Sequence, residues 1–423
     1  MSEATISSKP PKPMPVWTPP NPDPYAIPLE SIDMSNPLLY ENELWHAYFK
    51  RLRKEDPVHF NDSPWFGPIW SVTKFNDIMY VDTHHDIFSS ETGITIDDED
   101  PDFTLPMFIA MDPPKHDEQR KTVQGVVAPL NLAKLEGLIR ERMQRILDSL
   151  PVGQPFDWVD RVSIELTTQM LATLFDFPFE ERRKLTYWSD LVTGDMTDRT
   201  EEEQQAELLQ CLAYFQNLWH ERVNKPSGND LDLISMLAHG EATKNMPPME
   251  FLGNLILLIV GGNDTTRNSI SGGVIALNTF PKEYQKLRDN PALIPNMVSE
   301  IIRYQTPLLH MRRRAKVDTT LGGKQIKAGQ KVLMWYVSGN RDEEVVDRPD
   351  EFIIDRPKAR HHVSFGFGIH RCMGNRLAEM QLRIVWEEVM KRFRFVEVVG
   401  EPVRLRSNFV RGIRKLPVVL HPH

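Results

Sequence analysis

Cysteine is the scarcest chemically reactive residue in this chain, with only Cys211 and Cys372 among 423 residues. This scarcity excludes a disulfide-stapled scaffold and is typical of proteins in a reducing cytosol. It also excludes an iron–sulfur centre, which needs a cluster of cysteines. One cysteine with scattered histidines forms no spacing that would hold a zinc ion. We therefore expect a cytoplasmic protein without disulfides.

Long apolar runs are missing as well. The longest, Leu255 to Val260, is far too short to cross a bilayer. Residues 1–29 contain nine prolines but no apolar core of the signal-peptide type. Internal repeats and Gly/Ser linkers are also absent. We expect an extended proline-rich leader over residues 1–29, then a single domain over residues 30–423, monomeric and without a membrane anchor. The net charge of −9 gives no reason to expect nucleic acid as a partner.

What the chain does contain is a 40% share of hydrophobic residues, enough for a large core, and 26% charged residues for a polar surface. Helical patterns dominate residues 132–237, and the longest helix is predicted from Pro247-Pro248 to about Asn278. Shorter helices are predicted over residues 41–53 and 375–395. Short strands are predicted at residues 57–60, 70–73, 313–317, 319–326 and 332–337, with a hairpin turn at Gly322-Gly323. The pattern indicates a mainly α fold with small β-sheets.

Cys372 lies in an unusual loop, which contains three glycines and two phenylalanines between Phe365 and Gly374. An amphipathic helical pattern begins directly after the loop, near Asn375. Backbone N–H groups of such a loop and helix start would point toward the sulfur and favour the thiolate. A thiolate in a tight aromatic turn suits a soft or redox-active metal. The alternative is a buried structural cysteine beside a glycine turn.

The loop sequence Phe-Gly-Phe-Gly-Ile-His-Arg-Cys-Met-Gly, residues 365–374, resembles the haem-binding signature of the cytochrome P-450 family at every defined position. This family consists of haem-thiolate monooxygenases, and the chain looks like a soluble bacterial member. The resemblance implies the cytochrome P-450 fold, with a long central helix over the haem. It implies that Cys372 is the axial thiolate on the iron of haem b, a ligand that favours O–O cleavage. The resemblance also assigns to the cofactor-binding loop Phe365, Gly366, His370 and Gly374.

The segment after Met111-Asp112-Pro113-Pro114 is predicted to start a helix, which places His116 and Arg120 on one face. Taken alone, the pair would be interpreted as two ordinary exposed side chains on a helix surface. In the resembled family this His-x-x-x-Arg pattern contacts a haem propionate, a role that suits a guanidinium. Arg313 matches a family arginine at the second propionate, although its neighbours Arg312 and Arg314 leave the choice open by one position.

The centre of the long helix combines adjacent glycines, Gly261 and Gly262, with a polar cluster. Each glycine destabilises a helix by roughly 1 kcal/mol relative to alanine. Without a functional role, the segment would be interpreted as a bent helix with a polar patch. The resemblance implies instead that the glycines leave room for dioxygen. It implies that Thr265 hydrogen-bonds the bound oxygen and that Asp264 relays protons. The Thr265→Ala variant is then expected to consume reduced nicotinamide and to release peroxide while it forms little product.

Glu300 and Arg303 have helical i,i+3 spacing, which alone indicates a common surface pair of small energetic value. The resembled family carries the same Glu-x-x-Arg motif, and a later arginine before proline completes a buried ion network. Arg356, which precedes Pro357, matches that later position. The resemblance implies that these residues are structural and brace the loop that presents Cys372.

The resemblance, which covers roughly Tyr40 to the C-terminus, implies insertion of one oxygen atom from O2 into a substrate C–H bond. The electrons would come from NAD(P)H through separate proteins, since the chain shows neither a flavin-binding module nor a cysteine cluster. A ferredoxin and a flavin-dependent ferredoxin reductase are the implied partners. Arg371, Arg376 and Arg383 are expected on the cysteine side of the haem, where they would attract an acidic ferredoxin.

Substrate choice rests on the same resemblance, which places five apolar or small residues near the distal pocket: Leu257, Val260, Gly261, Leu309 and Phe409. No charged group is among them, so an apolar substrate is favoured. Met111 to Leu132 and Gly261 to Ser269 resemble bacterial terminal (omega) hydroxylases of medium-chain alkanes and fatty acids. Terminal hydroxylases of sterol side chains and branched lipids share much of the second stretch and form the alternative.

Two alternatives come from other classes of protein. A peroxide-driven haem peroxygenase also uses a cysteine thiolate, but those relatives usually lack the acid–threonine pair present here as Asp264-Thr265. A non-catalytic haem carrier or sensor would give no reason for a polar cluster in the long helix. A carbon monoxide spectrum of the reduced protein would separate thiolate from histidine ligation.

Overall fold

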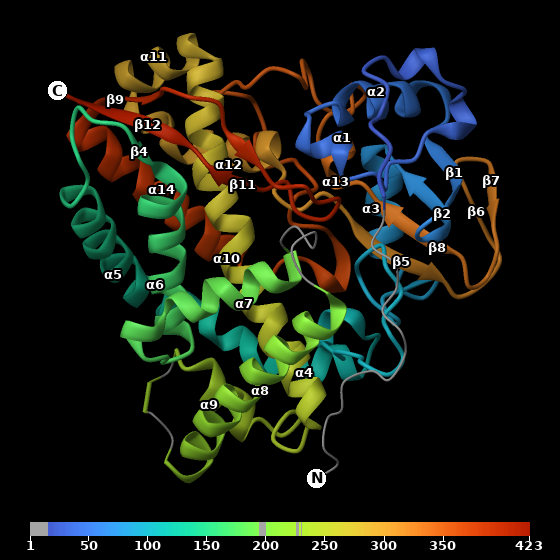
Figure 1. Ribbon diagram of the computed structural model, residues 1–423, viewed down its shortest axis with the longest axis horizontal. Coiled ribbons are helices and arrows are strands. Elements are labelled where there is room, and N and C mark those ends of the chain that lie inside the picture. The colour runs from blue at the N-terminus through green and yellow to red at the C-terminus, as the bar shows by residue number, and fades with distance from the viewer. Residues whose placement is uncertain (1–15, 194–199, 226–227, 230) are drawn as a thin grey trace.

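Helix α10 (Pro248–Thr279) is the longest helix of the described chain and runs through the middle of the molecule (Figure 1). The structure is a computed structural model that describes residues 16–193, 200–225, 228–229 and 231–423. At about 1.5 Å per residue, the 32 residues of α10 span about 48 Å. Pro248 starts the helix where no backbone N–H is needed, and Pro281 prevents its continuation. The predicted long helix is confirmed.

Shorter helices surround α10, which packs against α6, α7, α8, α12 and α14. The other α-helices of the described residues are α1 (Leu38–Glu41), α2 (Trp45–Glu55), α3 (Phe75–Thr83), α4 (Lys115–Val123), α5 (Pro129–Asp148), α6 (Glu165–Leu174), α7 (Arg183–Thr193), α8 (Glu201–Asn224), α9 (Leu233–His239), α11 (Pro281–Asp289), α12 (Ile294–Gln305), α13 (Tyr336–Gly339) and α14 (Asn375–Arg392). Most of α10 is buried because apolar residues occur all round it, as expected for a helix enclosed by others.

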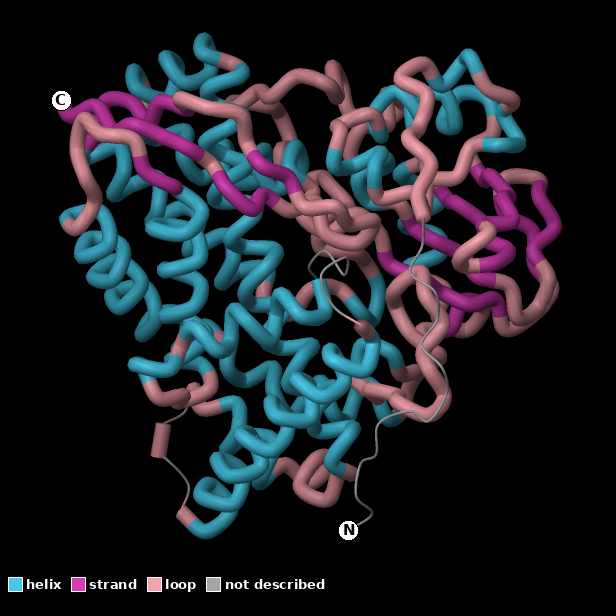
Figure 2. Tube along the Cα trace, in the orientation of Figure 1, coloured by secondary structure: helices cyan, strands magenta, loops and turns pink. Residues whose placement is uncertain are grey.

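The strands lie outside the helical centre, in one group beside α3 and another near the C-terminus (Figure 2). They are β1 (Val58–Ser63), β2 (Gly67–Val72), β3 (Phe88–Ser89), β4 (Phe156–Asp157), β5 (Met311–Ala315), β6 (Thr319–Leu321), β7 (Lys324–Ile326), β8 (Lys331–Met334), β9 (Phe393–Val398), β10 (Val403–Arg404), β11 (Ile413–Lys415) and β12 (Pro417–Pro422). The largest sheet has the order β1-β2-β8-β5-β3, and β4-β12-β9 form a second. Gly322 and Gly323 turn the β6–β7 hairpin with φ of 54° and 75°, as predicted. The mainly α fold with small sheets is confirmed.

In the described part of the chain, buried apolar side chains form three clusters. One lies among the helices around α10, and a second lies between α3 and the five-stranded sheet. The third joins α1 and α2 to Leu309 and Trp335. Cys211 belongs to the first cluster and has no exposed surface, and burial raises the pKa of its thiol. Such complete burial is typical of a structural cysteine.

The described part of the proline-rich leader packs on the body. Residues 24–26 and 29–31 form short 3-10 turns. The Tyr48 hydroxyl on α2 donates to the Asn21 carbonyl at 2.7 Å, and the Arg51 guanidinium donates to the Ile27 carbonyl at 2.8 Å. Residues 1–15 of the predicted leader lie outside the described residues. Residues 21 and 27 of the predicted leader thus contact α2, and the domain boundary at residue 30 stays a prediction.

The predicted helix over residues 41–53 is wrong at its beginning, because two helices, α1 and α2, occupy this region. Glu43 separates them with a positive φ of 55°. Its carboxylate accepts from Arg411 at 2.8 Å and from Arg404 at 3.2 Å. These long-range ion pairs stabilise a backbone conformation that local helix propensity opposes.

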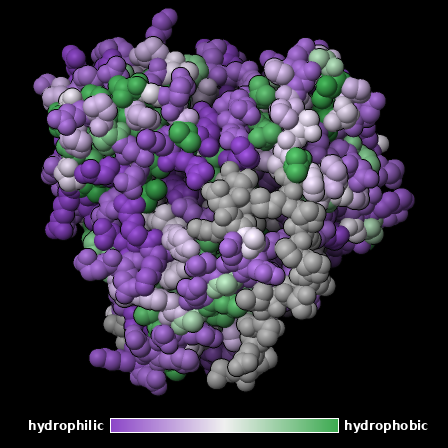
Figure 3. Space-filling view, viewed as in Figure 1, coloured by the Kyte–Doolittle hydropathy of each residue, from purple (hydrophilic) through white to green (hydrophobic). Residues whose placement is uncertain are grey.

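The face shown in Figure 3 is mainly hydrophilic, with apolar residues scattered over it. Within the described ranges, no helix combines the length and the apolar character that a membrane crossing requires.

Candidate active site

The Cys372 loop precedes α14 and is folded tightly on itself. The Cys372 amide donates to the Phe365 carbonyl at 2.8 Å, and the Gly366 amide donates to the Val363 carbonyl at 2.8 Å. Gly366 has a φ of 63°, and a Cβ at this position would lie 2.9 Å from Asp82 Oδ2. Glycine is required at residue 366 for its backbone conformation and for the close approach of Asp82.

The Cys372 thiol has opposing influences on its pKa, which is raised overall. Burial raises it most, whereas the backbone N–H groups of Gly374 and Asn375 lower it. The positive charges of Arg120 and Arg371 also lower it. The expected donors at the start of α14 are therefore present, but they do not outweigh burial. Protein atoms surround the Cys372 sulfur, yet part of the residue stays exposed, so a metal ion would find an accessible thiol with thiolate-stabilising donors around it.

His116 and His370 lie side by side, with ring centroids 4.2 Å apart. His116 Nδ1 bonds the Asp117 carboxylate at 2.7 Å, whereas His116 Nε2 and both ring nitrogens of His370 find no partner among the described residues. Burial and the neighbouring positive charges of Arg313, His116 and Arg120 lower the pKa of His370 to about 2. Buried nitrogens without partners are costly. An anionic group here would favour protonated rings, which donate from both nitrogens.

Arg120 on α4 reaches the same place, since its guanidinium donates to the Arg371 carbonyl at 2.5 Å. Four cofactor residues predicted from separate parts of the chain, His116, Arg120, Arg313 and His370, thus lie together. The carboxylates of an iron porphyrin fit these four residues, because the carboxylates would accept hydrogen bonds from the side-chain nitrogens that lack partners. The residues present therefore fit the haem implied by the sequence.

Arg313, rather than either neighbour, is the arginine of β5 that faces the Cys372 loop. Its guanidinium donates to Asp82 Oδ1 on α3 at 2.8 Å, and Asp82 Oδ2 accepts from the Phe367 amide at 2.6 Å. Arg312 is also buried but donates to the Gly93 and Asp97 carbonyls, on the other side of the strand. The alternating directions of strand side chains explain why only one of these two fits.

Asp82 is a site residue that the sequence analysis missed. It is 2% exposed, and besides Arg313 and the Phe367 amide it accepts from the Tyr336 hydroxyl at 3.2 Å. The one feature of the sequence that points to Asp82 is that this acidic residue follows Val81 within the apolar pattern of α3. Such an acid needs a buried partner, but nothing local identifies that partner.

The two glycines at the centre of α10 differ in their surroundings. A Cβ on Gly261 would meet no atom within 4 Å, whereas a Cβ on Gly262 would lie 2.8 Å from Leu171 Cδ2 on α6. The Thr265 hydroxyl donates to the Gly261 carbonyl at 3.0 Å, and Thr265 is half-buried. Gly261 therefore leaves open space beside α10, next to the Thr265 hydroxyl.

Asp264 faces away from that space. It has no exposed surface, and its carboxylate accepts from the Ser189 hydroxyl on α7 and pairs with Arg267. Burial raises its pKa, which Arg267 opposes and Asp190 reinforces. Adjacent helix residues point about 100° apart, so Asp264 and Thr265 contact different neighbours. The structure places the two predicted catalytic residues next to each other without a direct hydrogen bond between their side chains.

Glu300, Arg303 and Arg356 form one buried ion cluster. Glu300 pairs with Arg303 at 2.7 Å and with Arg356 at 3.0 Å. Arg303 Nη1 also donates to the Asn340 carbonyl at 2.9 Å. The Asn340 side chain accepts from the Val363 amide at 2.8 Å and donates to the Ser364 hydroxyl at 2.7 Å. Through Asn340 the cluster reaches the start of the Cys372 loop.

The predicted substrate contacts differ in exposure. Gly261 is exposed, and Leu257, Val260 and Phe409 are half-buried. Leu309 has no exposed surface and packs in the cluster with α1 and α2. Its role as a pocket residue stays a prediction, and the neighbouring Leu308 is the half-buried residue at this point of the chain.

The loop over residues 93–111 is irregular, as predicted, apart from a 3-10 turn at Phe108–Ala110. Arg312 fixes its first part through the carbonyls of Gly93 and Asp97. Its last part is fixed to α10, where the Asn254 side chain accepts from the Phe108 amide at 2.9 Å. The loop is therefore attached both to the sheet and to the helix that carries Thr265.

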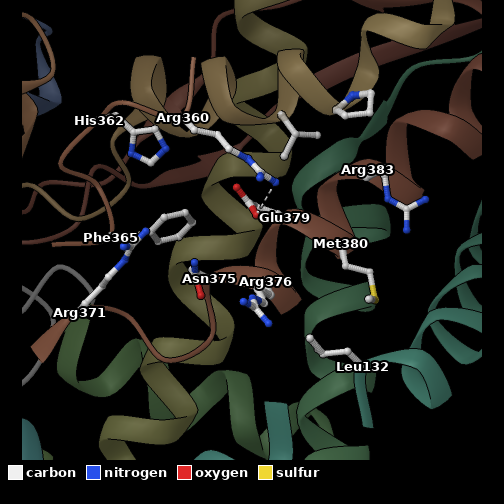
Figure 4. Close-up of a pocket in the computed structure, with 12 residues that line it drawn as sticks. Leu132, Arg360, His362, Phe365, Arg371, Asn375, Arg376, Glu379, Met380 and Arg383 are labelled. Carbon is white, nitrogen blue, oxygen red and sulfur yellow. Dashed lines mark hydrogen bonds and ion pairs between the residues drawn. The ribbon is translucent and has the colours of Figure 1, made fainter. Parts of the chain in front are cut away.

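A groove of about 520 Å³ borders the Cys372 loop (Figure 4). It is lined by Leu132, Pro295, Val298, Arg360, His362, Phe365, Arg371, Asn375, Arg376, Glu379, Met380 and Arg383. Four arginines face one glutamate there, and only the Arg360–Glu379 pair is joined within the groove, at 3.3 Å. Arg383 also pairs with Glu136 at 2.7 Å and with Glu387 at 2.8 Å. The lining therefore combines more arginines than acids with several apolar side chains.

Comparison with known proteins agrees with this geometry. The family described as cytochrome P450 matches residues 195–418. The chain is 36% identical to linalool 8-monooxygenase of Pseudomonas putida, over 93% of this chain and 100% of that protein. It is 32% identical to the methyl-branched lipid omega-hydroxylase of Mycobacterium tuberculosis, over 93% and 96%. The solved structure of cytochrome P450-153 from Novosphingobium aromaticivorans matches with a TM-score of 0.86 and 49% identity, over 92% and 99%. The chain therefore belongs to the cytochrome P450 family and is an oxidoreductase of the monooxygenase type.

Proposed function

We propose that the protein hydroxylates the terminal carbon of medium-chain alkanes or fatty acids, with Cys372 as the ligand of a haem. The observation that carries the proposal is the accessible Cys372 thiol beside a cluster of unpartnered, buried ring nitrogens. This arrangement fits a porphyrin, whose iron takes a thiolate and whose carboxylates need cationic partners. When bound, the haem supplies the activation of O2.

The residues around the Cys372 loop would hold that cofactor. His116, Arg120 and His370 would bind carboxylates, and Arg313 would contribute from β5 while Asp82 fixes its guanidinium. The ion cluster of Glu300, Arg303 and Arg356 would hold the loop through Asn340. Cys372 would hold the iron as a thiolate, so its thiol would give up its proton on binding.

Protons for the reaction would pass along α10. The net reaction takes up O2, two electrons and two protons, and converts R–H to R–OH and water. The Thr265 hydroxyl lies beside the open space at Gly261 and would donate there. Asp264, one residue earlier, would resupply the proton.

An apolar chain is the proposed substrate because the proposed contacts are Leu257, Val260, Gly261, Leu309 and Phe409, none of which is charged. The relative in Mycobacterium tuberculosis is named for omega-hydroxylation of a lipid, and other bacterial relatives are named steroid C26-monooxygenases. Both names and the resemblance of residues 261–269 to terminal alkane and fatty-acid hydroxylases favour attack at a chain end.

Electrons would come from NAD(P)H through a ferredoxin and its flavin-dependent reductase. The groove beside the Cys372 loop presents Arg371, Arg376 and Arg383, which would attract an acidic ferredoxin despite the net charge of −9. Arg383 would contribute least of the three, because Glu136 and Glu387 already pair with it. A partner at this groove would lie next to the ligand loop, where a short electron path is available.

Incubation of the reconstituted enzyme with octane and with dodecanoic acid tests the proposal. We expect 1-octanol or 12-hydroxydodecanoic acid as the main product, identified by mass spectrometry, and none with a Cys372→Ala control. Products oxidised only at internal carbons would contradict terminal hydroxylation. Turnover of a sterol or a methyl-branched lipid, with neither test substrate consumed, would favour the related sterol and branched-lipid hydroxylases instead.

A further inference from the structure

Two parts of the fold supply the residues that would bind the haem carboxylates. His116 and Arg120 lie on α4 among the helices, whereas Arg313 lies on β5 of the five-stranded sheet (Figure 1). A cofactor with two carboxylates binds both parts best when α4 and β5 already stand at the right separation, because such preorganisation lowers the cost of binding. The contacts that join α4 to β5 therefore bear on cofactor binding.

Asp112 makes a connection of this kind. It lies one helical turn before His116, whose amide donates to the Asp112 carbonyl at 3.2 Å. The Asp112 carboxylate is nearly buried and has both oxygens occupied. The Ser89 hydroxyl of β3 donates to Oδ2 at 2.8 Å, and the amide of the next residue, Ser90, donates to Oδ1 at 3.0 Å. The start of α4 is thus fixed to β3.

The same carboxylate also contacts the chain directly after β5. Lys316 Nζ donates to Asp112 Oδ2 at 3.2 Å. Ser89 is paired with Arg314 in the β3–β5 ladder, so the hydroxyl that holds Asp112 belongs to the strand beside the neighbour of Arg313. Through β3 and through Lys316, Asp112 therefore ties the start of α4 to the strand that carries Arg313.

Other contacts attach α4 to α10 and not to the sheet. Glu250 of α10 accepts from Lys115 Nζ at 2.8 Å and from the side-chain amide of Gln119. The Asn254 side chain donates to Gln119 Oε1 at 3.2 Å. These contacts would keep α4 in the fold without Asp112. Loss of the Asp112 carboxylate is therefore expected to leave α4 folded but free to shift relative to β5.

We propose that Asp112 is a positioning residue for cofactor binding, which holds His116 and Arg120 at the separation from Arg313 that lets both haem carboxylates bind together. This inference rests on the proposed haem site and goes beyond it, because an acid such as Asp112 would repel a carboxylate rather than bind it. Asp82 has the matching task at Arg313, whose guanidinium it accepts from at 2.8 Å.

A contact that only stabilises the fold is the simpler interpretation of Asp112, and a derivative of the cofactor separates the two interpretations. In the dimethyl ester of haem b, both carboxylates are replaced by neutral groups. A stabilising contact would affect the binding of haem b and of its ester equally, because it acts through the fold. A positioning residue would affect only the porphyrin that carries free carboxylates, since the two effects are then coupled.

The experiment measures how fast each porphyrin leaves the reconstituted full-length protein when an excess of apomyoglobin captures it. In Asp112→Ala, haem b is expected to leave at least about tenfold faster, because the displaced donors lose charge-assisted hydrogen bonds to the carboxylates. The dimethyl ester is expected to leave at the rate of the parent protein. Asp112→Asn keeps an acceptor oxygen but loses the charge that attracts Lys316, so its rate with haem b is expected to fall between.

A second measurement uses haem b alone. In a His116→Ala/Arg120→Ala background, the Asp112→Ala change is expected to add little to the release rate, because the residues that Asp112 positions are already gone. A purely stabilising contact would instead multiply the rate by the same factor in both backgrounds.

Asp318→Ala is the matched control for these variants. Asp318 lies at the surface and, like Asp112, accepts from a lysine and from a backbone amide, Lys327 Nζ at 2.8 Å and the Ala328 amide at 2.9 Å. Its loss is expected to change neither release rate. Equal acceleration of haem b and its ester in Asp112→Ala, unchanged release of haem b, or additive effects in the second measurement would overturn the positioning role. A parent protein that does not bind haem through Cys372 would instead refute the proposed function.

Discussion

Replacement of Cys372 by alanine is expected to abolish product formation, while replacement of Cys211 by alanine preserves it. Cys372 is accessible, lies just before α14 and is approached by the N–H groups of Gly374 and Asn375. Cys211 has no exposed surface and lies in the core on α8. A thiol buried in apolar surroundings is chemically inert, whereas a thiolate beside donors binds metal.

The two alanine variants are compared by haem content and by the rate of product formation with the best substrate. Cys372→His serves as a second variant, because an imidazole can hold haem iron. We expect this variant to bind haem without forming hydroxylated product, since the electron donation of the thiolate is lost. Hydroxylation by Cys372→Ala, or equal loss of activity in Cys211→Ala, would contradict the role of Cys372.

Glu300→Gln is expected to lower the free energy of unfolding by about 3–5 kcal/mol, because it leaves Arg303 and Arg356 buried without their counter-ion. Glu300 and Arg303 are almost fully buried, with side chains 0% and 1% exposed. The carboxylate also accepts from the Ile353 amide at 2.9 Å, so its loss disturbs the backbone before Arg356.

The matched control is Glu351→Gln, which removes the Arg348–Glu351 pair with the same i,i+3 spacing at the surface. These side chains are 58% and 51% exposed, so the expected cost is about 0–1 kcal/mol. Urea unfolding monitored by tryptophan fluorescence measures both variants. Equal effects of the two substitutions would show that the buried cluster is not a special support of the Cys372 loop.

Sequence patterns predict the features whose chemistry lies within one short segment. The Cys372 loop, the centre of α10 and the His116/Arg120 face of α4 each carry their spacing locally, so their positions could be predicted. Asp82 could not be predicted, because its partner Phe367 lies 285 residues away in the chain. Asn340, which links Arg303 to the Cys372 loop, likewise bonds residues that lie far from it in the chain, so its role could not be predicted either. Only the tertiary fold brings such pairs together.

The direction in which side chains point is the second feature that could not be predicted from the sequence. Leu308 and Leu309 are equally apolar, and only the packing of Leu309 against α1 and α2 shows which of them is fully buried. Asp264 and Thr265 form one motif, yet packing of α7 on α10 turns the acid toward Ser189. The break between α1 and α2 likewise depends on Arg404 and Arg411, which lie near the other end of the chain.

The most direct test of the account is the absorption spectrum of the reduced wild-type protein with carbon monoxide. Ligation of haem iron by the Cys372 thiolate predicts a strongly red-shifted Soret band, which Cys372→His lacks. A band of the histidine-ligated type in the wild-type protein would contradict Cys372 as the ligand, and with it the proposed mechanism.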